Sequence, residues 1–182
     1  MCIRDSPYGF SKLMMDQIAS KYSKENPEMI IVGLRYFNVY GPREFFKAKT
    51  SSMVIQLGHQ ILSGNAPKLF IGSDKILRDF IFIDDIIQAN IKASSPKKNG
   101  TYNIGTGSPR SFQDIADILQ KELGTDFKTQ YFPNPFDGYQ MHTQADISCA
   151  KKYLNFRPEF NLEKGINLYI SEIIRLSGVE NL

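Results

Sequence analysis

The feature that most constrains the fold is an apolar, β-branched run at residues 30–34, which lies between a helical segment and a turn containing Gly41 and Pro42. Val and Ile favour strands, and a short apolar run bounded by turn signals is typical of a strand buried in a parallel sheet. We therefore predict a buried strand at 29–36. It follows a helix at 11–24 and precedes a turn at 38–43 that leaves the sheet.

The rest of the chain alternates helical and strand-like patterns. Apolar residues at helical spacing predict helices at 51–63, 85–95, 112–123 and 162–176, and a shorter helix that begins at Asp146. Runs rich in β-branched and aromatic residues predict strands at 68–71, 79–83, 101–104 and 127–132. We expect Ser111 to cap helix 112–123, and Asp84 and Asp85 to cap helix 85–95 rather than to bind a metal. The fold class is accordingly α/β.

Charge and composition argue against several classes of function. The 182 residues carry a formal net charge of +3, and short basic clusters such as Lys97-Lys98 are typical of solvated loops rather than of a nucleic-acid surface. Cys2 and Cys149 provide no disulfide framework and suit a reducing cytoplasm. The sequence contains no apolar run of membrane-spanning length and no signal-peptide pattern. We expect a cytoplasmic protein with no metal site, no nucleic-acid partner and no membrane partner.

Tyr8 and Lys12 lie four residues apart, Tyr8 just before the first predicted helix and Lys12 within its first turn. Positions i and i+4 share a helix face, so the phenol and the ammonium point the same way. A free tyrosine keeps its proton to a pKa of about 10, and a nearby positive charge favours the phenolate. Such a pair can exchange a proton at a carbinol carbon that loses or gains hydride. The alternative is an ordinary amphipathic helix with a half-buried tyrosine and a solvated lysine.

Longer stretches follow this helix in a characteristic order. Residues 35–43 read Arg-Tyr-Phe-Asn-Val-Tyr-Gly-Pro-Arg, residues 67–73 read Pro-Lys-Leu-Phe-Ile-Gly-Ser, residues 78–85 read Arg-Asp-Phe-Ile-Phe-Ile-Asp-Asp, and residues 102–107 read Tyr-Asn-Ile-Gly-Thr-Gly. With Tyr-x-x-x-Lys, these stretches resemble the extended short-chain dehydrogenase/reductase superfamily and its NAD-dependent epimerase/dehydratase family. The stretch 138–146, together with Lys47, resembles the members that epimerise an ADP-activated heptose.

The resemblance implies a reaction and residues for it. These members invert C6'' of ADP-D-glycero-D-manno-heptose through a transient ketone, with bound NADP or NAD. Tyr8 and Lys47 would both transfer protons, because the hydroxyl occupies two positions during inversion and two groups serve them better than one. Lys12 would bind the nicotinamide ribose and act on Tyr8. The cofactor-binding residues implied are Lys12, Val39 and Lys47. The substrate-binding residues implied are Asn38, Lys49, Gln56, Phe70, Ile71, Gly72, Ser73, Arg78 and Tyr139.

Arg78 has the most specific chemical role in this set, because a guanidinium pairs with the oxygens of a diphosphate. Without the resemblance, each residue has a simpler interpretation. Arg78 could form a surface ion pair with Asp79 or Asp74, Lys47 could be a solvated loop lysine, and Gln56 an exposed helix glutamine. The remaining ambiguities are Tyr139, which could be packing, Lys49, which replaces a smaller residue, and Ala48, which stands where the family pattern leads us to expect glycine.

The resemblance also implies a domain organisation. Residues 7–43 and 79–104 would be the C-terminal part of a Rossmann-like parallel-sheet domain. Residues 44–78 and 105–182 would form mainly a small α/β substrate-binding domain, and residues 1–6 would be non-native. The stretch Gly105-x-Gly107 lacks the third glycine and the acidic residue of a dinucleotide fingerprint.

We therefore expect the C-terminal part of a longer, homo-oligomeric enzyme. A chain that lacks the cofactor-binding half would be inactive alone and would expose apolar surface and a strand edge. The alternatives are another nucleotide-sugar epimerase or dehydratase of the superfamily, and a chain that only binds nucleotide sugar.

Overall fold

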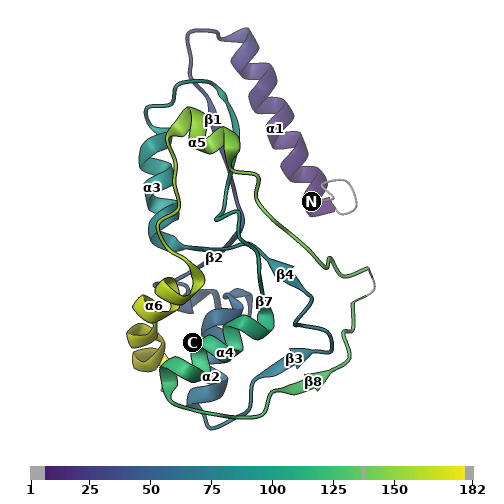
Figure 1. The fold of residues 1–182 in the computed structure, drawn as a ribbon. Coiled ribbons are helices and arrows are strands. Elements are labelled where there is room, and N and C mark those ends of the chain that lie inside the picture. The colour runs from purple at the N-terminus through teal and green to yellow at the C-terminus, as the bar shows by residue number, and fades with distance from the viewer. Residues whose placement is uncertain (1–6, 137, 179–182) are drawn as a thin grey trace.

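A computed structural model describes residues 7–136 and 138–178. Its helices are α1 (Pro7–Glu25), the 3-10 helix η1 (Phe45–Thr50), α2 (Met53–Leu62), α3 (Ile83–Ala93), α4 (Phe112–Leu123), α5 (Ser148–Leu154) and α6 (Leu162–Leu176) (Figure 1). Its strands are β1 (Val32–Tyr36), β2 (Asn38–Tyr40), β3 (Lys68–Phe70), β4 (Leu77–Arg78), β5 (Phe80–Phe82), β6 (Gly100–Ile104), β7 (Arg110–Ser111) and β8 (Gln130–Phe132). The predicted helices and strands are therefore present, with shifted ends, while η1, β2, β4 and β7 were not predicted as helix or strand.

β1 and β2 form an almost continuous strand that changes partner at Phe37. β1 pairs in parallel with β6, as far as Tyr36 opposite Ile104, and β2 pairs in parallel with β5, beginning with Asn38 opposite Phe80. β3 pairs in parallel with β8, and β4 pairs antiparallel with β7. The α/β fold class is confirmed. The predicted turn at 38–43 is wrong in its first half, because residues 38–40 remain hydrogen-bonded to β5.

Two apolar clusters form the interior. The larger cluster joins the inner faces of α2, α4 and α6 to β2 and β5, in the lower half of Figure 1. The smaller cluster joins α3 and α5 to β5 and β6 in the upper half. Helix α4 begins with the predicted cap: Ser111 accepts the N–H of Asp114, and the Asp114 carboxylate accepts the N–H of Ser111. Local capping and long-range packing thus agree on where this helix starts.

The predicted capping role of Asp84 and Asp85 is wrong. Phe82 occupies the N-cap position of α3, and no side chain caps that helix. Asp85 is buried and accepts the backbone N–H groups of Glu159 (2.8 Å) and Phe160 (3.2 Å). Burial raises the pKa of Asp85, and these two hydrogen bonds partly offset the increase. Its partners come from the segment that leads into α6, so only the tertiary fold could supply them.

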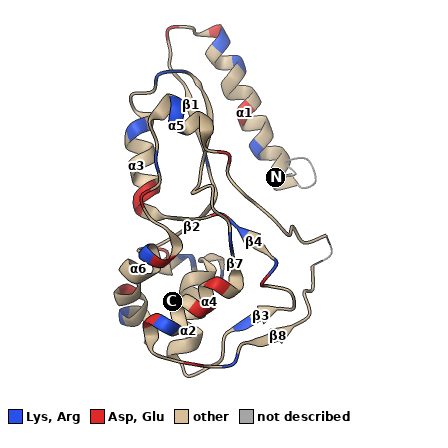
Figure 2. Ribbon diagram, viewed as in Figure 1, with Lys and Arg blue, Asp and Glu red and all other residues tan. Residues whose placement is uncertain are grey.

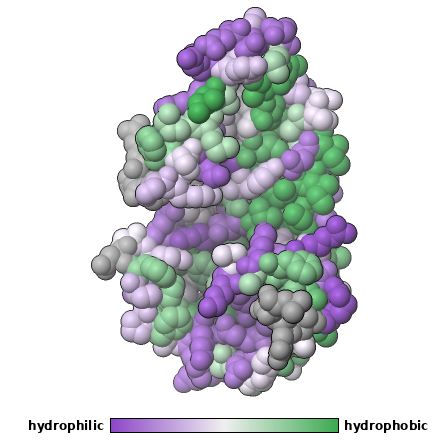
Figure 3. Space-filling view, turned by 180° about the vertical axis from the view of Figure 1, so that it is seen from behind, coloured by the Kyte–Doolittle hydropathy of each residue, from purple (hydrophilic) through white to green (hydrophobic). Residues whose placement is uncertain are grey.

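The surface is mixed in charge and partly apolar. Lys and Arg are interspersed with Asp and Glu along the ribbon (Figure 2). Seen from behind, apolar residues gather on the half of the molecule that contains α1, β1 and α3 (Figure 3). Exposed members include Met15 and Ile18 on α1 and Ile87 and Ile91 on α3. None of the helices in the described ranges is both long enough and apolar enough to cross a lipid bilayer.

Candidate functional site

Helix α1 brings Tyr8 and Lys12 together, as their spacing predicts. The Lys12 Nζ lies 5.2 Å from the centroid of the Tyr8 ring, and Tyr8 is 69% exposed. The ammonium therefore lies over the ring face. The helix is anchored to β1 by an ion pair between Asp16 and Arg35, with the Arg35 Nε 3.0 Å from the Asp16 Oδ2. This polar anchor fixes α1 beside β1 although few of its apolar side chains are buried.

The loop after β2 presents Lys47 and Lys49 to solvent from η1. Its two ends are joined by Glu44, which is buried. The Glu44 carboxylate accepts the N–H of Gly41 (3.3 Å) and both the N–H and the hydroxyl of Ser52 (each 2.7 Å). A buried carboxylate needs such donors. Glu44 therefore closes the loop, and its two lysines are exposed and form no ion pair within the described residues.

A cavity of about 380 Å³ lies between α2, β3, β8 and the start of α4. It is lined by Met53, Gln56, Gln60, Lys68, Leu69, Phe70, Ser73, Phe112, Phe132 and Tyr139. We call it the aromatic pocket. The Phe70 ring meets the rings of Phe132 (5.0 Å between centroids) and Tyr139 (5.8 Å) edge to face. The Ser73 hydroxyl is buried and has no hydrogen-bond partner within the described residues. An unpartnered hydroxyl in an apolar cavity is the feature expected of a site that awaits a polar ligand.

Arg78 lies beside the aromatic pocket and is only 7% exposed. Its guanidinium carbon lies 5.2 Å from the centroid of the Tyr139 ring and 5.9 Å from that of Phe112. Its two terminal nitrogens donate to the carbonyl oxygens of Leu77 (2.8 Å) and Gln140. Arg78 forms no ion pair within the described residues, so the alternative of a surface ion pair is wrong. Five donors with two occupied leave capacity for an anion.

Four other predicted residues do not line the aromatic pocket. Asn38 is exposed and Val39 is half-buried against the smaller cluster, both on β2. Ile71 is exposed in the turn after β3. Gly72 has a φ of 82°, and the space around its position for a Cβ is open, so the backbone conformation rather than crowding requires glycine. The structure thus groups Gln56, Phe70, Ser73, Arg78 and Tyr139, and places Tyr8 and Lys12 on a separate helix.

The remaining titratable residues form no second centre of this kind. Within the described residues, no group of three or more His, Cys, Asp and Glu side chains is placed to hold a metal ion. Burial lowers the pKa of His59. His142 is exposed. Cys2 and Ser6 lie outside the described residues.

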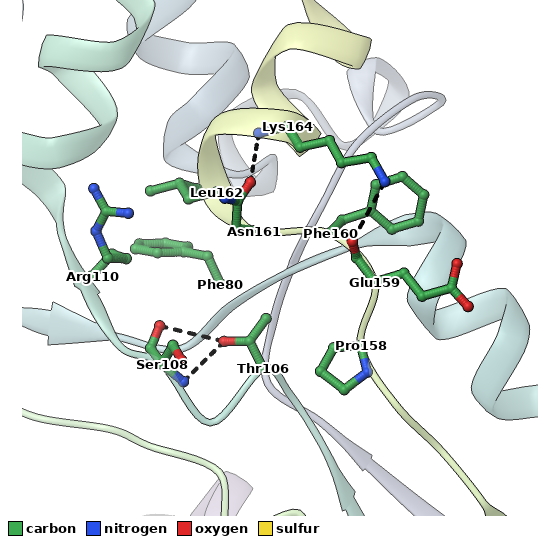
Figure 4. A pocket seen from close by; sticks show the side chains of 10 residues that line it. All are labelled: Phe80, Thr106, Ser108, Arg110, Pro158, Glu159, Phe160, Asn161, Leu162 and Lys164. Carbon is green, nitrogen blue, oxygen red and sulfur yellow. Dashed lines mark hydrogen bonds between the residues drawn. The ribbon is translucent and has the colours of Figure 1, made fainter.

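A second cleft, of about 450 Å³, contains none of the predicted residues (Figure 4). It is lined by Phe80, Thr106, Ser108, Arg110, Pro158, Glu159, Phe160, Asn161, Leu162 and Lys164. Its cations already have partners. Arg110 is paired with Asp114 (3.1 Å) and Glu163 (2.6 Å), and the Lys164 Nζ lies 4.3 Å from the Phe160 ring centroid. These pairs leave little free charge for a ligand, in contrast to Arg78.

Sequence reasoning missed six of the ten residues that line the aromatic pocket. Met53 and Gln60 precede and follow Gln56 by three and four residues on α2, so helical spacing could have identified them. Phe112 and Phe132 come from other elements, and no local pattern marks them. The aromatic character of the cavity is therefore a tertiary property.

The comparisons with known proteins all match epimerases or their family. Residues 3–105 match the NAD dependent epimerase/dehydratase family. An ADP-L-glycero-D-manno-heptose-6-epimerase of Brachyspira hyodysenteriae is 40% identical over 176 residues, which are 94% of this chain and 55% of that protein. The crystal structure of the ADP-L-glycero-D-manno-heptose-6-epimerase of Helicobacter pylori matches with a TM-score of 0.84 and 46% identity, over 93% of this chain and 51% of that one.

A variant of UDP-glucuronic acid 4-epimerase from Bacillus cereus also matches. Its structure, in complex with UDP-4-deoxy-4-fluoro-glucuronic acid and NAD, gives a TM-score of 0.80 and 32% identity, over 94% of this chain and 53% of that one. The chain therefore spans about half the length of the relatives that it matches.

Proposed function

The chain belongs to the NAD dependent epimerase/dehydratase family, and we propose that it supplies a proton-transfer centre and the sugar-nucleotide pocket of an enzyme that converts ADP-D-glycero-D-manno-heptose to its L-glycero epimer. Relatives at 40% and 46% identity carry that activity in their names. This product would serve the inner core of lipopolysaccharide. The division into a Rossmann-like domain (7–43 and 79–104) and a mainly substrate-binding domain (44–78 and 105–182) is part of the same proposal.

The observation that carries the proposal is the aromatic pocket with Arg78 at its edge. An apolar cavity with a few convergent polar groups suits a nucleobase, and a guanidinium suits a diphosphate. Ser73 and Gln56 would meet the polar edge of the nucleoside, while Phe70 and Tyr139 would contact its ring. Arg78, already held by Leu77 and Gln140, would turn its remaining donors to the phosphates.

The reaction would take place next to Tyr8, Lys12 and Lys47. Tyr8 would hold and release the proton of the C6'' hydroxyl, and Lys47 would serve the hydroxyl in its second position. Lys12 forms no ion pair within the described residues, so its ammonium is free to donate to ribose hydroxyls. The nicotinamide cofactor, when bound, supplies hydride acceptance and return at C6''. We propose NADP for this role, with NAD as the alternative, and Lys12, Val39 and Lys47 as its contacts in this chain.

Similarity to UDP-sugar enzymes supports a second candidate function, that of a related nucleotide-sugar epimerase or dehydratase. The base of the nucleotide that binds would distinguish the two candidate functions. Isothermal titration calorimetry of the 182-residue chain with ADP, UDP and GDP makes this comparison. We expect ADP to bind most tightly. Arg78→Ala should weaken ADP about 10- to 100-fold, because it removes charged hydrogen bonds. The matched control is Lys75→Ala, an exposed cation in the turn that precedes β4. Tighter binding of UDP or GDP, or an Arg78→Ala variant equal to wild type, would contradict the proposal.

Turnover gives a second test, in a polypeptide of full family length that contains these residues. Tyr8→Phe should remove most turnover and leave ADP-sugar binding unchanged, because it deletes only the phenolic hydroxyl that would transfer the proton. Tyr22→Phe, on the same helix, is the control. Equal turnover of the two variants would remove Tyr8 from the mechanism. Loss of ADP-sugar binding in both would point to a structural role for the helix.

A further inference from the structure

The partner change at Phe37 opens a fork between β6 and β5. The Phe37 N–H donates to the Ile104 carbonyl (3.0 Å), and the Asn38 N–H donates to the Asp79 carbonyl (3.0 Å). The pairing with β6 ends at Ile104, and the pairing with β5 begins at Phe80. Backbone N–H groups that leave a sheet at such a point need other acceptors if they are buried.

The Asp79 side chain provides those acceptors. It is fully buried (0% exposed). One oxygen accepts the N–H (2.7 Å) and hydroxyl (2.6 Å) of Thr106, and the other accepts the N–H groups of Gly107 (2.8 Å) and Ala145 (2.9 Å). A carboxylate that accepts four hydrogen bonds fixes three chain segments relative to one another.

The fork also explains the two glycines that resemble an incomplete dinucleotide fingerprint. A Cβ on Gly105 would lie 2.9 Å from the Asp79 Oδ2 and 2.6 Å from the Ala145 Cβ. Gly107 has a φ of 75°, which glycine adopts without strain. These glycines let the chain pack closely around the Asp79 carboxylate, so their role is a structural one at the fork.

Asp79 is coupled to the aromatic pocket through the segment 138–147. This segment runs past β4 toward α5 (Figure 1). Arg78 donates to the Gln140 carbonyl at one end of it, and Asp79 accepts from Ala145 at the other. Between them, the Leu77 N–H donates to the Met141 carbonyl (2.8 Å). The segment carries Tyr139, which stacks on Arg78.

We propose that Asp79 is a positioning residue that holds the Arg78 guanidinium and the Tyr139 ring in register for the diphosphate of a nucleoside diphosphate. This inference rests on the proposed function. Asp79 touches no ligand itself. It acts by fixing Ala145, and so the 138–147 strap, against the strand that carries Arg78.

The substitution Asp79→Asn tests this role, because it retains the size of the side chain. An amide offers one acceptor oxygen and brings two donors, so at least one of the N–H groups from Thr106, Gly107 and Ala145 loses its partner. The strap then shifts relative to Arg78, and the diphosphate contacts are affected more than contacts of the nucleoside. Asp84→Asn, at an exposed position in the first turn of α3, is the matched control.

The measurement is calorimetric titration of the 182-residue chain with ADP and with adenosine. For wild type we expect ADP to bind more tightly than adenosine, and we expect Arg78→Ala to abolish that difference. We expect Asp79→Asn to weaken ADP about tenfold and adenosine less than twofold, and Asp84→Asn to match wild type. Thr106→Val removes the hydroxyl that donates to Asp79 (2.6 Å) and accepts the N–H of Ser108 (3.1 Å), but it leaves the backbone donors to Asp79 in place. It should weaken ADP about two- to threefold and keeps the test valid if Asp79→Asn fails to fold.

The proposed nucleotide pocket and the positioning role of Asp79 would be overturned by different results. Equal binding of ADP and adenosine by wild type would overturn the proposed nucleotide pocket itself. If Arg78→Ala loses ADP while Asp79→Asn and Thr106→Val bind it like wild type, the pocket stands and the positioning role is overturned. A parallel loss of both ligands in Thr106→Val would also overturn that role, because it would indicate general destabilisation.

Discussion

Ala48 has a backbone conformation that an L side chain rarely adopts, with φ 47° and ψ −122° in the middle of η1. Such strain costs on the order of 1–3 kcal/mol. Glycine adopts the conformation freely but gains about 0.4–1 kcal/mol of unfolded-state freedom relative to alanine. The Ala48→Gly substitution should therefore raise the free energy of unfolding by about 0.5–2 kcal/mol. The loop keeps its bonds, because the Ala48 carbonyl still accepts the N–H (3.0 Å) and hydroxyl (2.7 Å) of Ser51.

Thermal unfolding followed by circular dichroism measures this effect. For a chain of this size we expect the midpoint to rise by about 1–8 °C. Ala66→Gly is the matched control, since Ala66 lies in a loop and has no positive φ. It should lower stability by about 0.4–1 kcal/mol. A fall in the midpoint for both variants would refute the claim that residue 48 is strained, and would leave the expected family glycine without a structural reason.

Three further predictions concern stability and association. Burial opposes ionisation of Asp114, but hydrogen bonds from Arg110 outweigh it and lower the pKa. The stabilisation is thus present above the unfolded-state pKa of about 3.9 and is lost as pH falls through the folded-state value. Asp114→Asn should make the free energy of unfolding, measured by denaturant titration, less dependent on pH in the acid range, and should lower it by about 0.5–2 kcal/mol at neutral pH. An unchanged pH dependence would contradict this. Gly165→Ala would place a Cβ 2.0 Å from the Tyr40 hydroxyl, so a loss of about 1–3 kcal/mol in chemical denaturation is expected, and a neutral result would refute the packing. Ile18 is an exposed apolar residue on α1, so Ile18→Lys should raise the protein concentration at which light scattering from self-association appears. Scattering equal to that of wild type would exclude α1 as the surface through which the protein self-associates.

Much of the fold could be predicted because its signals are local. The Ser111–Asp114 capping box and the periodicity of α2, α4 and α6 are readable over a few turns. The strand at 29–36 was also located, but its predicted burial was too great. β1 is half-buried, since within the described residues it pairs only with β6 on one edge. Burial depends on neighbours that a run of apolar residues does not specify.

The candidate site was predictable only where a family pattern named its residues. Gln56, Phe70, Ser73, Arg78 and Tyr139 were named from such patterns, and the structure gathers them at one pocket. Their roles remain proposals. Of the rest of the lining, Met53 and Gln60 belong to α2 and Lys68 and Leu69 to β3, while Phe112 and Phe132 come from α4 and β8 and look like ordinary core positions in the sequence. The same difficulty applied to Asp85, whose partners lie 74 and 75 residues away.

The sequence by itself determined most of the helices and strands, and it determined that Tyr8 and Lys12 lie together, because helix geometry converts a four-residue interval into a shared face. The tertiary structure alone decided the fork at Phe37 and the burial of Asp79, whose partners lie 27, 28 and 66 residues further along the chain. A carboxylate next to an arginine suggests a surface ion pair when only neighbours in sequence are considered. In the fold, backbone N–H groups near the fork need acceptors, and the buried Asp79 carboxylate accepts their hydrogen bonds.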